Sequence, residues 1–168
     1  MRTEVERMLE SIEKNRRDKI SYYLDIAETV SKRSTCLKRH YGAVIVKNSE
    51  IISTGYNGAP RGITNCIDKK ICNRESCERG TGYENCLAVH AEMNAIISSS
   101  RRDMLESSLF LVGLERDGTY VKEAEPCSIC KKIILNAGIK YVYVRINESQ
   151  YKLIFVDKWK REDFTGGY

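Results

Sequence analysis

His90-Ala91-Glu92, followed later by Pro126-Cys127-Ser128-Ile129-Cys130, decides how this sequence folds and what chemistry it supports. Each stretch opens an apolar run with helical spacing, so each marks the start of a helix that packs on a core. Catalytic zinc typically takes three protein ligands and keeps a fourth position for water. His90, Cys127 and Cys130 are the three candidate ligands, and Glu92 is the candidate catalytic acid–base group beside the open position. Either stretch alone is a weak signal, because Cys-x-x-Cys also occurs in structural zinc sites and redox pairs.

The expected positions of these ligands at helix starts suit their chemistry. Cys127 and Cys130 are three residues apart, so they share one face of a helix and can chelate one ion. The partial positive charge at a helix N-terminus favours thiolate over thiol. Pro126 stands where no amide hydrogen is required, and Gly138 is a typical residue for ending a helix. We therefore predict a helix over 127–137 that presents two thiolates to a metal.

The rest of the chain predicts short strands interleaved with helices. Apolar periodicity and turn residues indicate the order β-β-α-β-α-β after two N-terminal helices, with a further strand at the end. The expected helices are 1–17, 21–32, 89–97 and 127–137, and the expected strands are 43–46, 51–54, 109–114, 141–144 and 153–156. This order predicts the α/β class: a three-layer α/β/α domain with a mixed sheet of about five strands. We expect residues 1–168 to form one domain, with residues 1–20 as an N-terminal helical extension.

Bulk properties limit the classes of protein to consider. The chain has 168 residues, enough to bury a proper core, and it has no apolar run long enough to cross a membrane. Seven cysteines without an export signal favour a reducing compartment, so we expect a cytoplasmic protein. A net charge of +5 suits an anionic substrate, but it is too small and dispersed to indicate nucleic-acid binding.

The amino-acid sequences of several segments resemble those of one enzyme family. The loop Gly55-Tyr56-Asn57-Gly58-Ala59-Pro60-Arg61-Gly62 and the stretch Val89-His90-Ala91-Glu92-Met93-Asn94-Ala95-Ile96 are similar to those of deoxycytidylate (dCMP) deaminases. These enzymes belong to the zinc-dependent cytidine/deoxycytidylate deaminase superfamily, in which H-x-E followed by P-C-x-x-C is typical. Residues 34–36, 42–46 and 136–139 extend the resemblance, which covers roughly Ser21 to Val144. The glycine-rich loop distinguishes this family from deaminases that act on tRNA adenosine, guanine or riboflavin precursors.

The resemblance implies a reaction and a set of roles. The reaction is hydrolysis of dCMP to dUMP and ammonia, which feeds thymidylate synthesis. A zinc-activated water attacks C4 of the pyrimidine while Glu92 carries its proton first to N3 and then to the departing amine. Asn57 is the implied contact to the sugar, and the backbone around Ala91 and Glu125 reads the base edge.

Other implications concern assembly, effectors and the phosphate. The family implies homo-oligomers, hexamers or dimers, that dCTP activates and dTTP inhibits near the glycine-rich loop, with Mg²⁺ accompanying the nucleotide effector. For the 5′-phosphate, Arg33, Lys38 and Arg39 are candidates because they precede the first strand. A solvated surface charge explains each of them equally well.

Five cysteines remain after the catalytic pair, and four of them lie in the long polar segment 63–87. A structural zinc would order such a loop. Some members of the resembled family carry a second zinc with ligands that match Cys36 and Cys66; Cys72 and Cys86 would complete that site. Cys77 would then be left over. Ordinary reduced thiols or reversible disulfides are the alternative.

Different functions remain open at this stage. The same chemistry would suit another cytosine nucleotide or nucleoside, such as CMP, cytidine or dCTP, or a cytosine-containing antibiotic. A base in nucleic acid is a further alternative, although no aromatic and basic stripe suited to stacking a strand is present. A zinc-stabilised binding module without activity is a third, but a structural site has no use for Glu92 beside the metal.

Overall fold

The computed structural model describes residues 3–6, 12–13, 16–78 and 81–161. Of the predicted N-terminal helix 1–17, residues 4–6 and 12–13 are helical, whereas 1–2, 7–11 and 14–15 lie outside the described residues. Within the described ranges, no helix is both long and apolar enough to cross a membrane.

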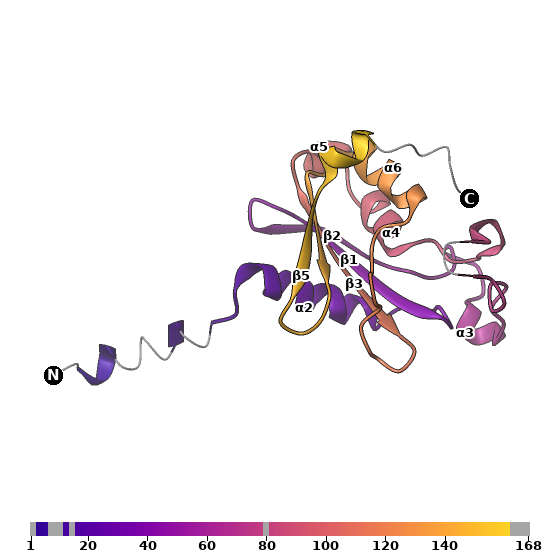
Figure 1. Cartoon of the computed structure of the whole chain (residues 1–168), viewed down its shortest axis with the longest axis horizontal. Helices are drawn as coiled ribbons and strands as arrows, with labels where there is room; N and C mark the ends of the chain where they lie inside the picture. The colour runs from indigo at the N-terminus through magenta and orange to yellow at the C-terminus, as the bar shows by residue number, and fades with distance from the viewer. Residues whose placement is uncertain (1–2, 7–11, 14–15, 79–80, 162–168) are drawn as a thin grey trace.

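A mixed sheet of five strands forms the centre of the fold, as the sequence predicts (Figure 1). Its strands are β1 (Arg39–Lys47), β2 (Glu50–Tyr56), β3 (Ser108–Glu115), β4 (Tyr141–Arg145) and β5 (Tyr151–Phe155). They lie in the order β2-β1-β3-β4-β5; β3 and β4 pair in parallel, and all other neighbours are antiparallel. The β1–β2 hairpin turns at Asn48 and Ser49, which both adopt the left-handed conformation that suits a two-residue turn.

The helices include short ones that the sequence did not predict. The helical elements are α2 (Lys19–Ser31), α3 (Cys66–Lys69), η1 (Tyr83–Asn85), α4 (Ala91–Ile97), α5 (Arg101–Met104), α6 (Ser128–Ala137) and η2 (Val156–Arg161). α2, α4 and α6 correspond to predicted helices. α3, α5 and the two 3-10 segments are too short to show a periodic apolar pattern. Ser100 illustrates the ambiguity: it follows the end of α4, as expected, but its hydroxyl also caps α5 by accepting a hydrogen bond from the Asp103 amide.

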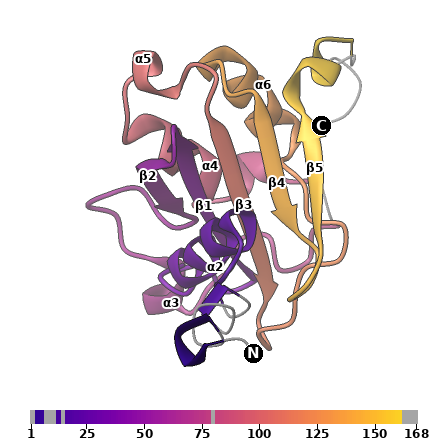
Figure 2. The same ribbon diagram turned by 90° about the vertical axis from the view of Figure 1, so that its left-hand side faces the viewer.

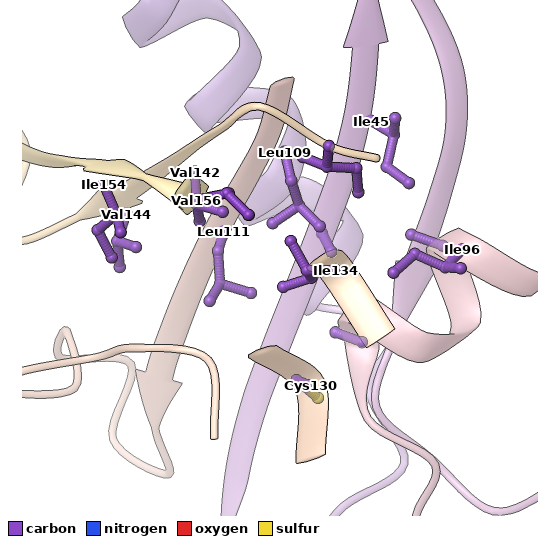
Figure 3. Close-up of a cluster of buried hydrophobic side chains, with 14 of the residues drawn as sticks. Ile45, Ile96, Leu109, Leu111, Cys130, Ile134, Val142, Val144, Ile154 and Val156 are labelled. Atoms are coloured by element: carbon purple, nitrogen blue, oxygen red, sulfur yellow. The ribbon is translucent and has the colours of Figure 1, made fainter. Parts of the chain in front are cut away.

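Alternation along the strands gives each face of the sheet its own core. On one face α2 packs across β1 and β3, as Figure 2 shows. The buried side chains on this side are Tyr23, Leu24, Ala27, Val44, Val46, Phe110, Val112 and Leu114. On the other face, α4 and α6 cover the alternate positions, where Ile45, Leu109, Leu111 and Ile134 are fully buried (Figure 3). The arrangement is the predicted α/β/α three-layer class.

Cys130 belongs to this second core, beside Ile134 one turn later on α6 (Figure 3). The core therefore holds the N-terminal end of α6 rigidly, which fixes the thiol in position. α4 is held on the same face by its own hydrogen bonds to β2: the Ser53 hydroxyl donates to the Ala95 carbonyl at 2.7 Å, and the Asn94 amide donates to the Tyr56 carbonyl at 2.7 Å.

Candidate active site

His90, Cys127 and Cys130 come together at the adjoining N-termini of α4 and α6. His90 is the residue before α4, Cys127 is the residue before α6, and Cys130 lies in the first turn of α6. The ligand atoms of the three residues all lie within 4.8 Å of one another, the only such group of three among the described residues. His90 Nδ1 is 3.4 Å from Cys127 Sγ and 3.3 Å from Cys130 Sγ. The predicted ligand set is therefore assembled around one point.

These spacings fit a zinc ion. Tetrahedral zinc bonded to nitrogen at about 2.0 Å and to sulfur at about 2.3 Å separates its ligand atoms by about 3.5 Å. The two measured nitrogen–sulfur distances are close to that value. His and Cys donors at this spacing, with the buried Glu92 carboxyl group nearby, suit a three-ligand zinc site that leaves one position open.

The charges of the two thiols depend on each other. The hydrogen bond with Cys130, opposed by burial and reinforced by His90, lowers the pKa of Cys127 to about 4. The same pairing raises the pKa of Cys130. Without a metal the pair therefore tends to keep one proton. A coordinated cation removes that proton too, because a metal-bound thiol is deprotonated.

Glu92 lies in the first turn of α4, two residues beyond the histidine. Its side chain is buried, with 4% of the residue exposed, although it makes no ion pair among the described residues. Burial raises the pKa of this carboxyl group. A carboxyl group with a raised pKa, held beside the ligand cluster but outside it, is suited to accept and return a proton.

Gly55 on β2 lets α4 approach the sheet closely enough to bring His90 to the thiols. A Cβ atom at Gly55 would lie 2.3 Å from the Ala95 nitrogen and 2.4 Å from the Ala91 oxygen, both atoms of the α4 backbone. Any larger residue would therefore push the helix outward. This glycine belongs to the loop that carries the family resemblance, and its packing role was not predicted.

A cavity of about 410 Å³ opens onto the ligand cluster. Its lining includes the predicted residues Asn57, Ala91, Glu92 and Glu125, together with Tyr41, Tyr83, Ala88, Cys36, Cys86, Lys38, Arg39, Arg74, Glu78 and Glu123. The volume is within the range of small-molecule sites. The cavity thus joins the metal ligands to the predicted substrate contacts.

Asn57 is buried and largely occupied by structural hydrogen bonds. Its Oδ1 accepts from the Ser34 hydroxyl at 2.7 Å and from the Tyr41 amide at 2.7 Å, and its Nδ2 donates to the Arg39 carbonyl at 2.9 Å. One amide hydrogen is left for a ligand. The residue therefore ties the glycine-rich loop to β1 while standing in the cavity wall. Glu125 also lines the cavity, and its carboxylate pairs with Lys152.

The three basic residues that the sequence offers as phosphate contacts differ in their positions relative to the cavity. Arg33 is exposed and does not line the cavity, whereas Lys38 and Arg39 do. Arg74 also lines it, and sequence reasoning missed this residue because it lies in the irregular segment after the glycine-rich loop. Tyr83 was missed for the same reason; its ring meets the His90 ring edge-to-face, with 5.3 Å between centroids.

The four cysteines predicted for a second zinc gather loosely. Burial raises the pKa of the Cys66 thiol, and the neighbouring Cys36, Cys86 and Cys72 thiols raise it further. Cys36 Sγ also accepts a hydrogen bond from the Lys38 amide, at 3.4 Å. No three of their sulfur atoms all lie within 4.8 Å of one another, as the ligand atoms of His90, Cys127 and Cys130 do. The second site therefore stays a prediction.

Comparison with known proteins decides the family. The sequence pattern described as the cytidine and deoxycytidylate deaminase zinc-binding region matches residues 17–146, which include all three ligands. The chain belongs to this deaminase family. Among its relatives are deoxycytidylate deaminases of Schizosaccharomyces pombe, 36% identical over 125 residues, and of a Mycobacterium phage, 33% identical over 135 residues.

The extent of each likeness differs. The match to the fission yeast enzyme covers 73% of this chain but 35% of that enzyme, whereas the match to the phage enzyme covers 76% of this chain and 94% of that one. A crystal structure of the dCMP deaminase from the cyanophage S-TIM5 in complex with dCMP and dUMP is 30% identical, with a TM-score of 0.51. That likeness covers 74% of this chain and 78% of the phage chain. The deaminase fold and the zinc-binding family predicted from the sequence are confirmed.

Proposed function

We propose that this protein hydrolyses dCMP to dUMP and ammonia. The observation that carries the proposal is a buried carboxyl group, Glu92, beside a His–Cys–Cys cluster that opens onto a cavity of about 410 Å³ with three basic residues in its wall. The relatives named deoxycytidylate deaminase, and the related phage enzyme crystallised with dCMP and dUMP, support this substrate over other cytosine compounds.

His90, Cys127 and Cys130 would hold zinc, which when bound acidifies a water molecule enough to supply hydroxide near neutral pH. Glu92 takes the proton that this water releases, because its buried carboxyl group has a raised pKa and holds a proton readily. It delivers this proton to N3 of the pyrimidine, then takes the second proton from the hydroxyl group newly bonded to C4 and gives it to the departing amine. Protonation of N3 makes C4 more electrophilic as the new C–O bond forms, and protonation of the amine lets ammonia leave.

The substrate contacts extend the proposal along the cavity. The remaining amide hydrogen of Asn57 would bind the sugar, and the backbone near Ala91 and Glu125 would read the base edge. All three residues line the cavity, which supports these roles. The backbone of Ala91 is fixed by the α4 start, and Glu125 by its pairing with Lys152.

A second, structural zinc is part of the proposal. Cys36, Cys66, Cys72 and Cys86 would bind it and tie segment 63–87 to the start of β1. The mutual influence of these thiols on the pKa of Cys66, and the amide hydrogen bond to Cys36 Sγ, support the assignment. Metal–thiolate binding would offset the entropy of ordering a loop with few buried apolar residues.

Assembly and regulation follow from the family resemblance alone. We propose homo-oligomers, dimers or hexamers, that respond to dCTP and dTTP, with Mg²⁺ accompanying the effector. The product would feed thymidylate synthesis in the cytoplasm. The glycine-rich loop 55–62 supports this part of the proposal, since it is the segment most specific to the family.

Ammonia release from a panel of substrates tests the proposal. The zinc-loaded protein is assayed with dCMP, CMP, deoxycytidine, dCTP and single-stranded DNA under identical conditions. We expect dCMP to give the highest kcat/KM. A higher value for deoxycytidine, dCTP or DNA would replace the proposed substrate, and no ammonia from any of them would reject the deaminase function.

A further inference from the structure

Three cations line the cavity, and two of them are already engaged by the protein. Lys38 Nζ donates to the backbone carbonyls of Arg74 at 2.9 Å, Cys77 at 3.3 Å and Glu75 at 3.5 Å. Lys38 therefore fixes the turn of segment 74–77 rather than facing a ligand.

Arg39 is engaged by an acidic side chain. Its Nε lies 3.0 and 3.1 Å from the two carboxylate oxygens of Glu115 across the β1–β3 pair. This hydrogen bond raises the pKa of Arg39 and neutralises its charge locally. The charge of Arg39 is therefore balanced by Glu115, and the three donors of Lys38 are occupied by backbone carbonyls.

Arg74 is different. Within the described residues it makes no ion pair, and its Nε is buried without a hydrogen-bond partner. Its guanidinium carbon instead lies over the Tyr83 ring, 4.2 Å from the centroid. A buried donor without a partner is costly and rare in native proteins, and a bound ion or water is one explanation for it. The Lys38 hydrogen bond to its carbonyl holds the Arg74 backbone in place.

The position of Arg74 relative to the metal ligand His90 also bears on its role. The Tyr83 ring contacts both the Arg74 guanidinium and the His90 ring, the latter edge-to-face. In a pyrimidine nucleotide, the base and the sugar separate the reacting C4 from the 5′-phosphate. The cavity wall thus carries His90 and Cys127 of the ligand cluster and, in contact with the same tyrosine as His90, an arginine without an ion pair among the described residues.

We propose that Arg74 binds the 5′-phosphate of the nucleotide and thereby sets the preference for the monophosphate over the free nucleoside. This inference rests on the proposed function. The planar guanidinium is suited to bidentate contact with phosphate, and its stacking on Tyr83 holds the plane before the substrate arrives. Arg74 is a specificity residue, since its target is the part of the substrate that does not react.

Steady-state kinetics on dCMP and deoxycytidine test the proposal with the zinc-loaded protein and its R74Q, R74K and R33Q variants. A charge-assisted contact of this kind corresponds to a loss of about 10- to 150-fold in kcat/KM. We expect R74Q to lose that much on dCMP, mainly through KM, and to keep the wild-type value on deoxycytidine. R74K keeps the charge without the planar fork, so we expect a smaller loss on dCMP alone. R33Q is the matched control and should leave both substrates unchanged.

The outcomes separate the two proposals. If wild-type protein does not act on dCMP, the proposed function fails. If the wild type acts on dCMP but R74Q loses kcat/KM equally on both substrates, Arg74 only supports Tyr83 and His90. If R74Q loses kcat/KM on neither substrate, Arg74 has no role. Either result overturns the phosphate assignment. Should deoxycytidine turn over too slowly to measure, the inhibition constants of dUMP and deoxyuridine give the same comparison. Should R74Q fail to bind zinc or fold, R74K decides: a loss confined to the phosphorylated compound supports the assignment, and any other pattern overturns it.

Discussion

Gly55→Ala should damage the active site although Gly55 itself does not line the cavity. The added methyl group would stand 2.3 to 2.4 Å from backbone atoms of α4, where ordinary contact begins at 3.4 Å. Backbone cannot rotate away as a side chain can. The helix that carries His90 and Glu92 must therefore move outward by about 1 Å, or β2 must yield by the same amount.

The size of the effect follows from that displacement. Overpacking of this kind costs about 1–3 kcal/mol of folding free energy. Metal ligands tolerate shifts of about 0.2 Å, so a His90 displaced by about 1 Å binds zinc poorly together with the two thiols. Misplacing catalytic groups by about 1 Å can reduce turnover about 10²-fold. We expect a folded protein with reduced zinc content and kcat/KM on dCMP lowered by about two orders of magnitude.

Zinc content, the thermal midpoint and kcat/KM are measured together for G55A and a control, G118A. Gly118 lies in the turn after β3 with a φ of 85°, and a Cβ there would meet nothing within 4 Å. G118A should therefore lose about 1 kcal/mol through backbone strain and keep full zinc and activity. If G55A also keeps wild-type zinc and kcat/KM, the close contact between α4 and β2 does not position the ligands, and the reasoning is wrong.

Four further results are expected. Glu92→Gln should retain zinc and the fold while kcat falls by about 10²–10⁴-fold, and near-normal turnover would remove its role as proton carrier. Cys127→Ala should lose both activity and the catalytic metal in a metal-content assay; full retention of that metal contradicts the ligand set. Protein prepared without added zinc should hold two equivalents per chain, falling to one in Cys66→Ser, and a single equivalent in the wild type would refute the second site. Asp25→Asn should lower the free energy of unfolding at neutral pH by about 1 kcal/mol, because the buried Arg145 loses its 2.6 Å ion pair with Asp25. This value allows for solvent screening at the partly exposed Asp25 side chain.

The last of these predictions has a pH signature. The hydrogen bond from Arg17, and then that from Arg145, lower the pKa of Asp25 in the folded protein. The stabilisation is therefore fully present above the unfolded pKa of about 3.9 and is lost as pH falls through the lower folded value. Denaturation curves should accordingly converge for wild type and D25N in acid; a difference that stays constant down to the lowest pH would contradict the assignment.

Local patterns determined much of this protein. The helix starts at His90 and Cys127, the thiol spacing and the alternation on β1 and β3 are properties of neighbouring residues, so the sequence alone predicted α4, α6, the mixed sheet and the catalytic ligand set. The structure confirms the two helices and the mixed sheet, and it brings His90, Cys127 and Cys130 to positions from which they can bind one metal ion. Short elements escaped prediction because one turn of helix has no period, as α3 and α5 demonstrate.

Tertiary structure decided which charges are available and which backbones touch. Lys38, Arg39 and Arg74 are equivalent basic residues in the sequence. Only the fold brings backbone carbonyls to Lys38 and the Glu115 carboxylate to Arg39, and it places Arg74 over the Tyr83 ring. Likewise the sequence places Gly55 in a glycine-rich loop, whereas in the structure it lies on β2 against the backbone of α4. Both facts depend on contacts between residues far apart in the chain, and such contacts are set by how the layers pack and not by local spacing.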